Sequence, residues 1–328
     1  MSLRVGIVGM GKMGRIRLRE MQALGNFELV AVTDINPALK SEFADIFKES
    51  WKEVLDENLD AVFVCTFNDV IADIVCEALK LGIHVFSEKP PGRTIECTNR
   101  MKNAHLESGK VLKFGFNHRF HRSVMRAREI IDSGKYGKVL WARGEYGKPA
   151  EIDFDKVWRS NKDLAGGGIL LDQGIHMADL LIYFLGDFNE VKSFVGTHHW
   201  DIPMEDNAFA IMRNDRGQVA MLHSSSTHWK NHFSLKICLD DGMVHLDGIL
   251  SNSMAYAPEK VIIYEKDLET KQTKKVIEEE FQDDPSWKME VEDFYDAIKQ
   301  NREPKHGTII DSLAVMNLIK EIYDDGKR

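Results

Sequence analysis

The stretch LRVGIVGMGKMG at residues 3–14 decides the fold. It begins with a run that is apolar except for Arg4, Leu3 to Val8, and this is typical of a buried strand. Three glycines, Gly9, Gly11 and Gly14, follow at the spacing G-x-G-x-x-G and open a helical pattern. A strand that leads through such a turn into a helix is typical of dinucleotide-binding βαβ units. The start of the chain therefore predicts a Rossmann domain.

Each position of this turn has its own physical role. Gly9 permits the tight turn, Gly11 lets the backbone approach a pyrophosphate, and Gly14 lets the helix lie close to the strand. The helix N-terminus then faces the anion. Asp34 follows about 20 residues later, where a carboxylate accepts hydrogen bonds from ribose hydroxyls and repels a 2′-phosphate, and Ile35 offers no compensating positive charge. The pattern favours NAD over NADP; the alternative is a glycine-rich turn of an ordinary α/β protein.

The rest of the chain shows two different patterns. Up to about residue 120, short β-branched runs alternate with helical segments, which is typical of a parallel sheet. Further on, alternating strands dominate, and Asp240-Asp241-Gly242 is a strong hairpin signal. We therefore expect an α/β protein with an NAD-binding Rossmann domain over residues 1–120. Residues 121–328 are expected to form a substrate-binding and oligomerisation α+β domain with an open, largely antiparallel sheet, covered by helices near residues 287–299 and 309–323.

Composition narrows the function classes. The 328 residues are enough for two domains, and 43% of them are apolar, as in an ordinary globular protein. The formal charge of −9 argues against a protein that coats nucleic acid, which needs a basic face. We expect no membrane partner, because no stretch approaches the roughly 18 apolar residues of a membrane span. We expect a cytoplasmic location, since the four cysteines lack C-x-x-C spacing and no apolar signal stretch precedes the first strand.

Two further segments carry groups suited to hydride transfer. Lys89, in Glu88-Lys89-Pro90, follows a predicted parallel strand at its carboxyl end, where open α/β sheets place ligands. An ammonium there can hydrogen-bond a substrate oxygen and favour its alkoxide character. Asp172 and His176 are four residues apart at a predicted helix start, so both side chains are expected on one face. The imidazole can take the hydroxyl proton, and the preceding Gly166-Gly167-Gly168 would leave room for substrate and chain to pass closely.

These motifs together resemble the Gfo/Idh/MocA oxidoreductases. The resemblance covers essentially the whole chain and also includes Trp158-Arg159. It implies that Lys89, Asp172 and His176 form the catalytic set, with the histidine as the usual acid/base. It also implies a second domain used for oligomerisation, as dimers or tetramers. The alternating strands point to a homo-oligomer independently, because an antiparallel sheet with one uncovered face invites a partner.

Further residues are expected to complete the site. The expected cofactor contacts are Gly9, Gly11, Lys12, Met13, Gly14, Asp34, Thr66, Asn68, Glu88 and Lys89. The expected substrate contacts are Asn117, Arg119, Trp158, Arg159 and Trp229. Arg159 fits a domain-interface salt bridge equally well, and Trp229 fits a core aromatic beside a solvated lysine. No metal is expected, because the pairs His118/His121 and His198/His199 have no further ligands to complete them.

The leading functional hypothesis is hydride transfer between NAD and a secondary alcohol or ketone of a sugar, polyol or nucleotide sugar. One alternative is a redox-neutral enzyme, in which a tightly held NAD oxidises the sugar transiently. Another alternative, from a different class, is a non-catalytic sensor that binds the dinucleotide and a partner protein. Such a sensor would be expected to lack the lysine or the histidine, and this chain has both.

Overall fold

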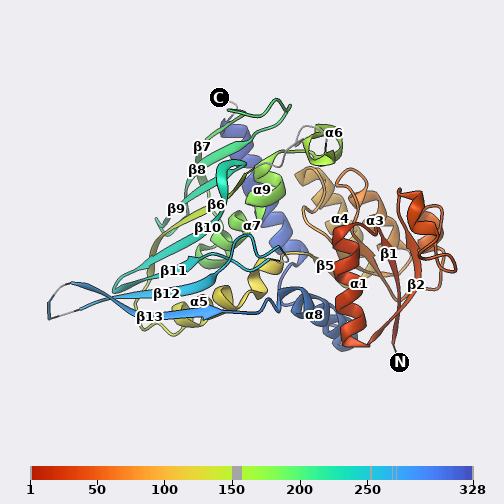
Figure 1. The fold of residues 1–328 in the computed structure, drawn as a ribbon, viewed down its shortest axis with the longest axis horizontal. Coiled ribbons are helices and arrows are strands. Elements are labelled where there is room, and N and C mark those ends of the chain that lie inside the picture. The colour runs from red at the N-terminus through yellow and green to blue at the C-terminus, as the bar shows by residue number, and fades with distance from the viewer. Residues whose placement is uncertain (1, 150–156, 252, 268, 271, 327–328) are drawn as a thin grey trace. The chain divides into compact units, whose positions relative to one another are not determined.

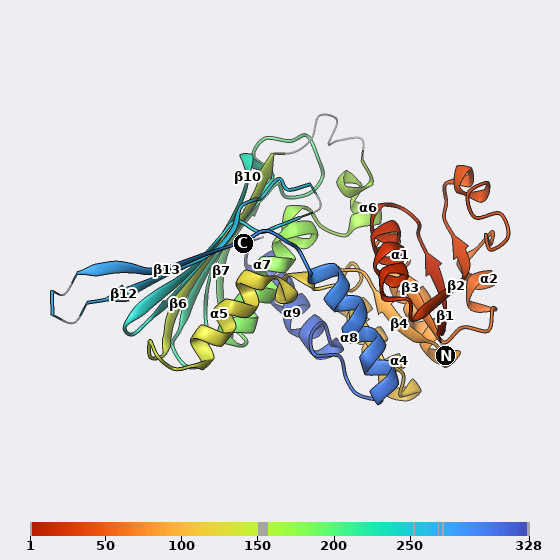
Figure 2. The same ribbon diagram turned by 60° about the horizontal axis from the view of Figure 1, so that its bottom comes forward.

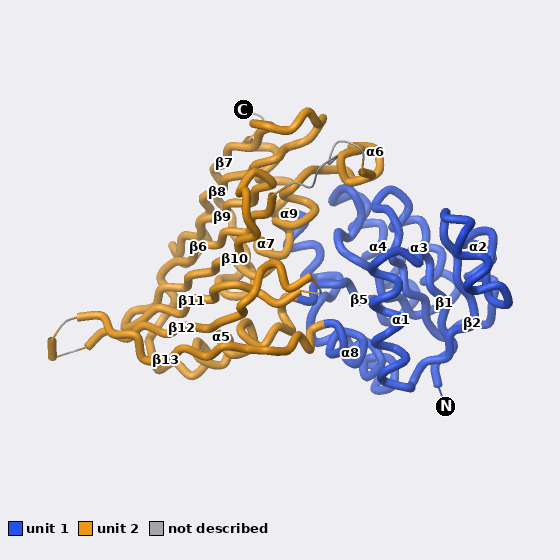
Figure 3. Tube along the Cα trace, viewed as in Figure 1, with its two compact units in different colours: residues 1–117, 287–316 blue, residues 118–286, 317–328 orange. Residues whose placement is uncertain are grey.

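The computed structural model describes residues 2–149, 157–251, 253–267, 269–270 and 272–326. The chain forms two compact units, residues 1–117 with 287–316 and residues 118–286 with 317–328 (Figure 3). The predicted division at residue 120 follows sequence order alone, whereas the first unit also contains residues 287–316.

The first unit is built on a five-stranded parallel sheet with the strand order β2-β1-β3-β4-β5 (Figure 1). Its strands are β1 (Leu3–Val8), β2 (Phe27–Thr33), β3 (Ala61–Val64), β4 (His84–Ser87) and β5 (Leu112–Phe114). The helical segments between them are α1 (Lys12–Leu24), η1 (Pro37–Lys40), α2 (Trp51–Leu55), α3 (Ile71–Lys80) and α4 (Ile95–Ser108). The order reverses between β1 and β3, and doubly wound sheets bind ligands beyond the carboxyl ends of the strands at such a point.

Helix α8 (Ser286–Gln300) belongs to the core of this first sheet. Val291, Phe294 and Ala297 are fully buried with residues of β1 and β3. The Phe294 ring meets Phe63 and Phe86 edge-on, with centroids 5.5 and 5.6 Å apart. The prediction that this helix covers the antiparallel sheet is therefore wrong. Its apolar face packs against the parallel sheet of the first unit instead.

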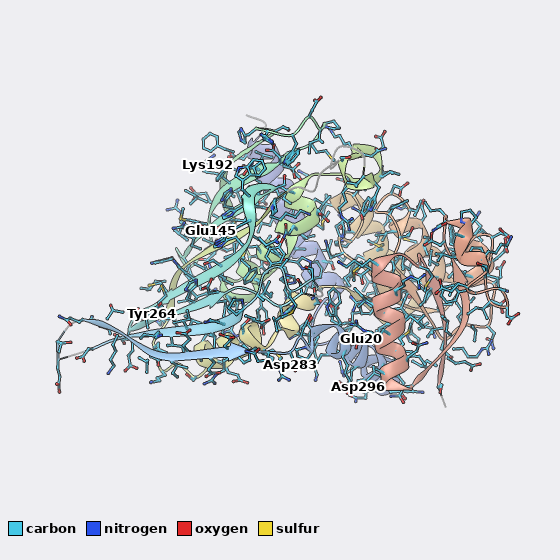
Figure 4. The ribbon with its side chains drawn as sticks, in the orientation of Figure 1. Glu20, Glu145, Lys192, Tyr264, Asp283 and Asp296 are labelled. Carbon is cyan, nitrogen blue, oxygen red and sulfur yellow. The ribbon has the colours of Figure 1, made fainter. Side chains whose placement is uncertain are left out.

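The second unit contains an eight-stranded sheet with the order β13-β12-β11-β10-β6-β9-β8-β7. Its strands are β6 (Val139–Pro149), β7 (Glu190–Gly196), β8 (Asn207–Arg213), β9 (Val219–Ser225), β10 (Thr227–Leu239), β11 (Gly242–Asp247), β12 (Glu259–Lys266) and β13 (Thr273–Phe281). All neighbours are antiparallel except β6 and β9, so the predicted fold class is confirmed. Lys192, Glu145 and Tyr264 mark the strands β7, β6 and β12 in Figure 4.

Helices lie along one face of this larger sheet. They include α5 (Arg122–Asp132) and α7 (Ile175–Leu185), as Figure 2 shows. Shorter turns are η2 (Asn117–Phe120), η4 (Trp158–Ser160), α6 (Lys162–Ala165) and the π-helical turn η5 (Leu170–Gly174), and α9 (Ile309–Gly326) closes the chain. The helical stretch 162–185 is long and apolar enough to cross a membrane, but 83% of its apolar window is buried in the protein, as in a core helix.

Candidate active site

The glycine turn after β1 is tight where the sequence pattern requires it. Gly9 has φ +92°, and a Cβ there would lie 2.4 Å from the carbonyl oxygen of Cys65. A Cβ on Gly14 would lie 2.1 Å from the carbonyl oxygen of Gly9. Around Gly11 nothing lies within 4 Å of the Cβ position. Packing within the protein therefore requires glycine at positions 9 and 14. At Gly11 the backbone stays accessible to a ligand.

The start of α1 fits a dinucleotide. Gly11 is its N-cap, and no side chain caps the helix. Its first N–H groups can therefore bind a pyrophosphate. At the end of β2, Asp34 accepts hydrogen bonds from the backbone N–H of Met10 at 2.6 Å and of Asn36 at 2.8 Å. Asp34 thus ties the glycine turn to β2, at the position expected for the ribose, while Lys12 is exposed and Met13 half-buried beside the turn.

The other expected cofactor residues follow β3 and β4 at their carboxyl ends. Thr66 lies against the glycine turn, since its backbone nitrogen is 3.1 Å from the Cβ position of Gly9. Asn68 is buried, and Lys89 is half-buried directly after β4. The Lys89–Pro90 peptide bond is cis.

Glu88 points its carboxylate into the first unit. Its Oε1 accepts a hydrogen bond from Nε of Arg17, a fully buried residue of α1, at 2.7 Å. The same guanidinium lies 2.8 Å from the carboxylate of Glu290 on α8 and stacks on the rings of Phe86 and Trp287. Burial raises the pKa of Glu290 to about 7, although Arg17 acts against the rise. Through Arg17, Glu88 therefore connects the end of β4, directly before Lys89, to α1 and α8.

In the second unit, η5 and α7 carry the expected acid/base pair. The carboxylate oxygens of Asp172 accept hydrogen bonds from Lys148 Nζ and Arg159 Nε, both at 3.2 Å. Asp172 lies in the π-helical turn η5, and His176 lies two residues after that turn, in α7. Such turns are frequent at functional sites.

The imidazole of His176 is buried in a cluster of rings. It stacks on His118, with centroids 3.9 Å apart and planes inclined by 16°. His118 Nε2 lies 3.2 Å from the hydroxyl oxygen of Tyr146, and the His121 ring meets His118 edge-on at 5.4 Å. His121 in turn bonds the buried carboxylate of Glu259 at 2.9 Å. The cluster fixes the plane in which the His176 ring lies.

Polar groups beside the turn were not predicted as site residues. Gln173 donates a hydrogen bond to the hydroxyl of Tyr256 at 2.6 Å, and burial raises the pKa of Tyr256 to about 12. Lys148 and Tyr146 lie among the last four residues of the long strand β6 and could have been suspected from that position. No sequence signal connects Gln173 or Tyr256 with the site.

The expected substrate residues have different surroundings. Arg119 is buried and donates hydrogen bonds to the Asp179 carboxylate from Nε at 2.9 Å and from Nη2 at 2.7 Å. Asn117 is buried. Arg159 lies over the Trp158 ring, 4.5 Å from its centroid. Trp229 is 60% exposed, has φ 58°, and contacts the rings of His199 and Trp200, so it is no core aromatic.

In the described ranges, no group of three or more His, Cys, Asp or Glu side chains could hold a metal ion. The absence of a metal stays a prediction.

Comparison with known proteins identifies the family. Residues 3–116 match the family described as an oxidoreductase family with an NAD-binding Rossmann fold, and residues 124–245 match the Gfo/Idh/MocA C-terminal domain. The chain belongs to the Gfo/Idh/MocA family. It is therefore an NAD-dependent oxidoreductase, and the predicted family, cofactor and enzyme class are confirmed.

Two relatives in this family are dehydrogenases of sugar compounds. The chain is 31% identical to the D-glucoside 3-dehydrogenase of Escherichia coli, over 68% of this chain and 70% of that enzyme. It is 28% identical to the levoglucosan dehydrogenase of Pseudarthrobacter phenanthrenivorans, over 66% of this chain but only 60% of that enzyme. A solved levoglucosan dehydrogenase in complex with NADH has the same fold, with a TM-score of 0.86 at 21% identity, over 100% of this chain and 97% of that one.

Proposed function

We propose that this chain transfers a hydride between NAD and a secondary alcohol or ketone of a sugar, polyol or nucleotide sugar. The observation that carries the proposal is the buried imidazole of His176, which lies on the same helical stretch as Asp172. The ring of His118 stacks on this imidazole and holds it. Lys89, Asp172 and His176 form the proposed catalytic set. The sugar and polyol dehydrogenases among the relatives support the substrate class.

The proposed roles follow from the chemistry of each group. Bound NAD supplies the hydride acceptor. His176 takes the proton from the reacting hydroxyl and returns it in the reverse direction. The Lys89 ammonium donates a hydrogen bond to the same oxygen and stabilises its developing negative charge. Asp172, flanked by Lys148 and Arg159, accepts hydrogen bonds from a substrate hydroxyl, and the protonated Tyr256 hydroxyl can donate one.

The remaining expected contacts belong to the same proposal. NAD is proposed to contact the glycine turn with Lys12 and Met13, then Asp34, Thr66 and Asn68. The substrate is proposed to contact Asn117, Trp158, Arg159 and Trp229. For Glu88 and Arg119 we propose indirect roles instead, because buried ion pairs engage their charged groups.

A substrate screen with matched variants tests the proposal. NADH formation is followed with inositols, glucosides, anhydrosugars and nucleotide sugars. His176→Asn and Lys89→Met should each lower kcat by at least about 100-fold, the usual range for a lost acid/base group. Full activity of both variants would refute the assigned roles. NAD retained through purification, with turnover that needs no added cofactor, would select the redox-neutral alternative, and binding without any turnover would select the sensor.

We also propose that the chain forms a homo-oligomer through the larger sheet. On the face opposite to α5 and α7, Phe194 is 82% exposed, Ile211 52% and Met221 44%. Phe194 lies opposite Phe209, and Ile211 opposite Met221, so they form one apolar patch. Ile211→Lys should shift the sedimentation equilibrium toward monomer, whereas the control Val276→Lys on β13 should not. An unchanged assembly in Ile211→Lys would place the interface elsewhere.

A cytoplasmic location is proposed from the cysteines. Cys65, Cys76, Cys97 and Cys238 are all free thiols, as expected in a reducing compartment. Fractionation of cells with an antibody to the native chain tests this.

A further inference from the structure

The glycine run before Asp172 is filled by the protein's own atoms. A Cβ on Gly167 would lie 2.4 Å from the hydroxyl oxygen of Tyr323, and one on Gly168 would lie 2.1 Å from the carbonyl oxygen of Glu205. The space that the missing side chains leave is therefore used by Tyr323 and Glu205. At Gly167 and Gly168 the glycine run thus lets other parts of the chain pass closely, as expected.

Glu205 binds three consecutive backbone N–H groups at the start of the helical stretch. Its Oε2 accepts from Gly168 at 2.9 Å, its carbonyl oxygen from Ile169 at 3.1 Å, and its Oε1 from Leu170 at 3.0 Å. Helix starts leave such N–H groups without intrahelical partners. One residue from a distant loop therefore caps the segment that carries Asp172 and His176.

The cap is itself held in place. Tyr323 on α9 donates a hydrogen bond to Oε1 of Glu205 at 2.8 Å. Glu205 is only 8% exposed, and burial raises its pKa, while the hydrogen bonds from Tyr323, Leu170 and Gly168 act against the rise. The positive end of the helix dipole also favours a carboxylate at this point.

The turn is fixed on its other side by β9. Ser224 Oγ donates a hydrogen bond to the carbonyl oxygen of Ile169 at 3.2 Å, and a Cβ on Gly174 would lie 2.6 Å from the same Oγ. The π-helical turn thus lies between Glu205 and Ser224, and loss of the cap frees one side of it.

Resting on the proposed function, we propose that Glu205 is a positioning residue that sets the directions of Asp172 and His176. Glu205 binds the backbone N–H groups of residues 168–170, directly before Asp172, so its effect on the pair is transmitted through this stretch of backbone. A misplacement of about 1 Å at a catalytic group costs about 100-fold in rate.

The test compares Glu205→Ala and Glu205→Gln with the control Glu321→Gln, a glutamate of α9 outside this cap. Glu205→Ala should lower kcat by about 10- to 100-fold, and Glu205→Gln less, because one amide oxygen can still accept one N–H. The affinity for NADH, measured by fluorescence, should stay unchanged in all three variants. A merely structural role would leave kcat per folded molecule unchanged.

Hydrogen exchange at residues 168–176 separates this proposal from the proposed function. In Glu205→Ala these amides should exchange faster than in Glu321→Gln, whatever the reaction is. Unchanged exchange and unchanged kcat would overturn the proposal. If Glu205→Ala does not fold, Tyr323→Phe, which removes one hydrogen bond from the carboxylate, should show a smaller effect in the same two measurements. If only the proposed function is wrong, His176→Asn should keep full activity, while the amides of residues 168–176 should still exchange faster in Glu205→Ala.

Discussion

Two helical segments of this protein begin after glycines, and they differ in what binds the free backbone N–H groups at their N-termini. α1 follows Gly9-x-Gly11 and has no side-chain cap. The stretch that carries Asp172 and His176 follows Gly166–Gly168 and is capped by the Glu205 carboxylate. An open N-terminus can bind the anion of a ligand, whereas an internally capped one is held rigidly and can present side chains. On the roles proposed above, similar sequence patterns therefore serve cofactor binding in one unit and positioning in the other.

An uncapped helix must be anchored by other contacts, and α1 is anchored through Arg17. Arg17→Met would leave the carboxylates of Glu88 and Glu290 buried without their cation. We expect the free energy of unfolding to fall by about 3–5 kcal/mol, the usual cost of breaking a buried ion pair on one side. Urea denaturation, followed by the fluorescence of the nearby Trp287, measures this.

The matched control lies two residues away on the same helix. Arg15 forms a solvent-exposed ion pair with Glu42, so Arg15→Met should leave the urea midpoint nearly unchanged. Equal midpoints for the Arg17→Met and Arg15→Met variants would show that α1 does not depend on the buried pair.

The capped segment should respond to a methyl group at its glycines. Gly168→Ala places a Cβ against the Glu205 carbonyl oxygen, and we expect a loss of about 1–3 kcal/mol in the free energy of unfolding, as for other overpacked sites. Differential scanning calorimetry of the whole chain measures it. Gly196→Ala is the control in the same unit, because its Cβ position has no contact closer than 3.4 Å, to the His198 ring. A Gly168→Ala variant as stable as this control would mean that the cap can move freely.

The sequence predicts the first of these two segments much better than the second. Gly9, Gly14 and Asp34 act within one βαβ unit, so a local pattern contains the reason for each. The cap of the second segment depends on Glu205, a residue 37 positions from Gly168, and no local spacing connects the two. The stacking of His118 on His176 is missed for the same reason. The apolar face of α8 predicts a buried helix but not which sheet it covers, and there the prediction failed.

Asp206, next to Glu205, also binds several backbone N–H groups, but these belong to a loop and not to a helix start. Replacing it tests whether such hydrogen bonds stabilise a loop as well. Asp206 accepts hydrogen bonds from the N–H groups of His198, His199 and Trp200, at 2.9, 2.7 and 3.0 Å. Burial raises its pKa, but these bonds outweigh that and lower the pKa below 3.8. Asp206→Asn should cost about 1–2 kcal/mol in the free energy of unfolding at neutral pH, measured by urea denaturation.

The sign of the pH effect follows from the lowered pKa. The unfolded chain binds the Asp206 proton more readily than the folded chain, so the stabilisation is present above the ordinary pKa of 3.8 and is lost as the pH falls through the lower folded value. The difference between wild type and Asp206→Asn should therefore shrink in acid. The exposed Asp201, replaced by Asn, is the control. A difference that persists at low pH would contradict the assignment.

The smallest effect on stability is expected at Gly11, where the open N-terminus has to accept its ligand. Gly11→Ala adds a methyl group to empty space, so the free energy of unfolding should stay unchanged. At the proposed cofactor site, however, the methyl group would stand where the pyrophosphate approaches the backbone. NADH should therefore bind about tenfold more weakly, which corresponds to about 1.4 kcal/mol. Fluorescence titration with NADH gives the affinity, and urea denaturation the stability. Gly14→Ala is the contrasting variant, because its Cβ would clash with the Gly9 carbonyl oxygen. This variant should lower both the affinity for NADH and the free energy of unfolding. If Gly11→Ala bound NADH as tightly as the wild type, the uncapped start of α1 would not be the pyrophosphate site, and the contrast between the two helix starts would no longer hold.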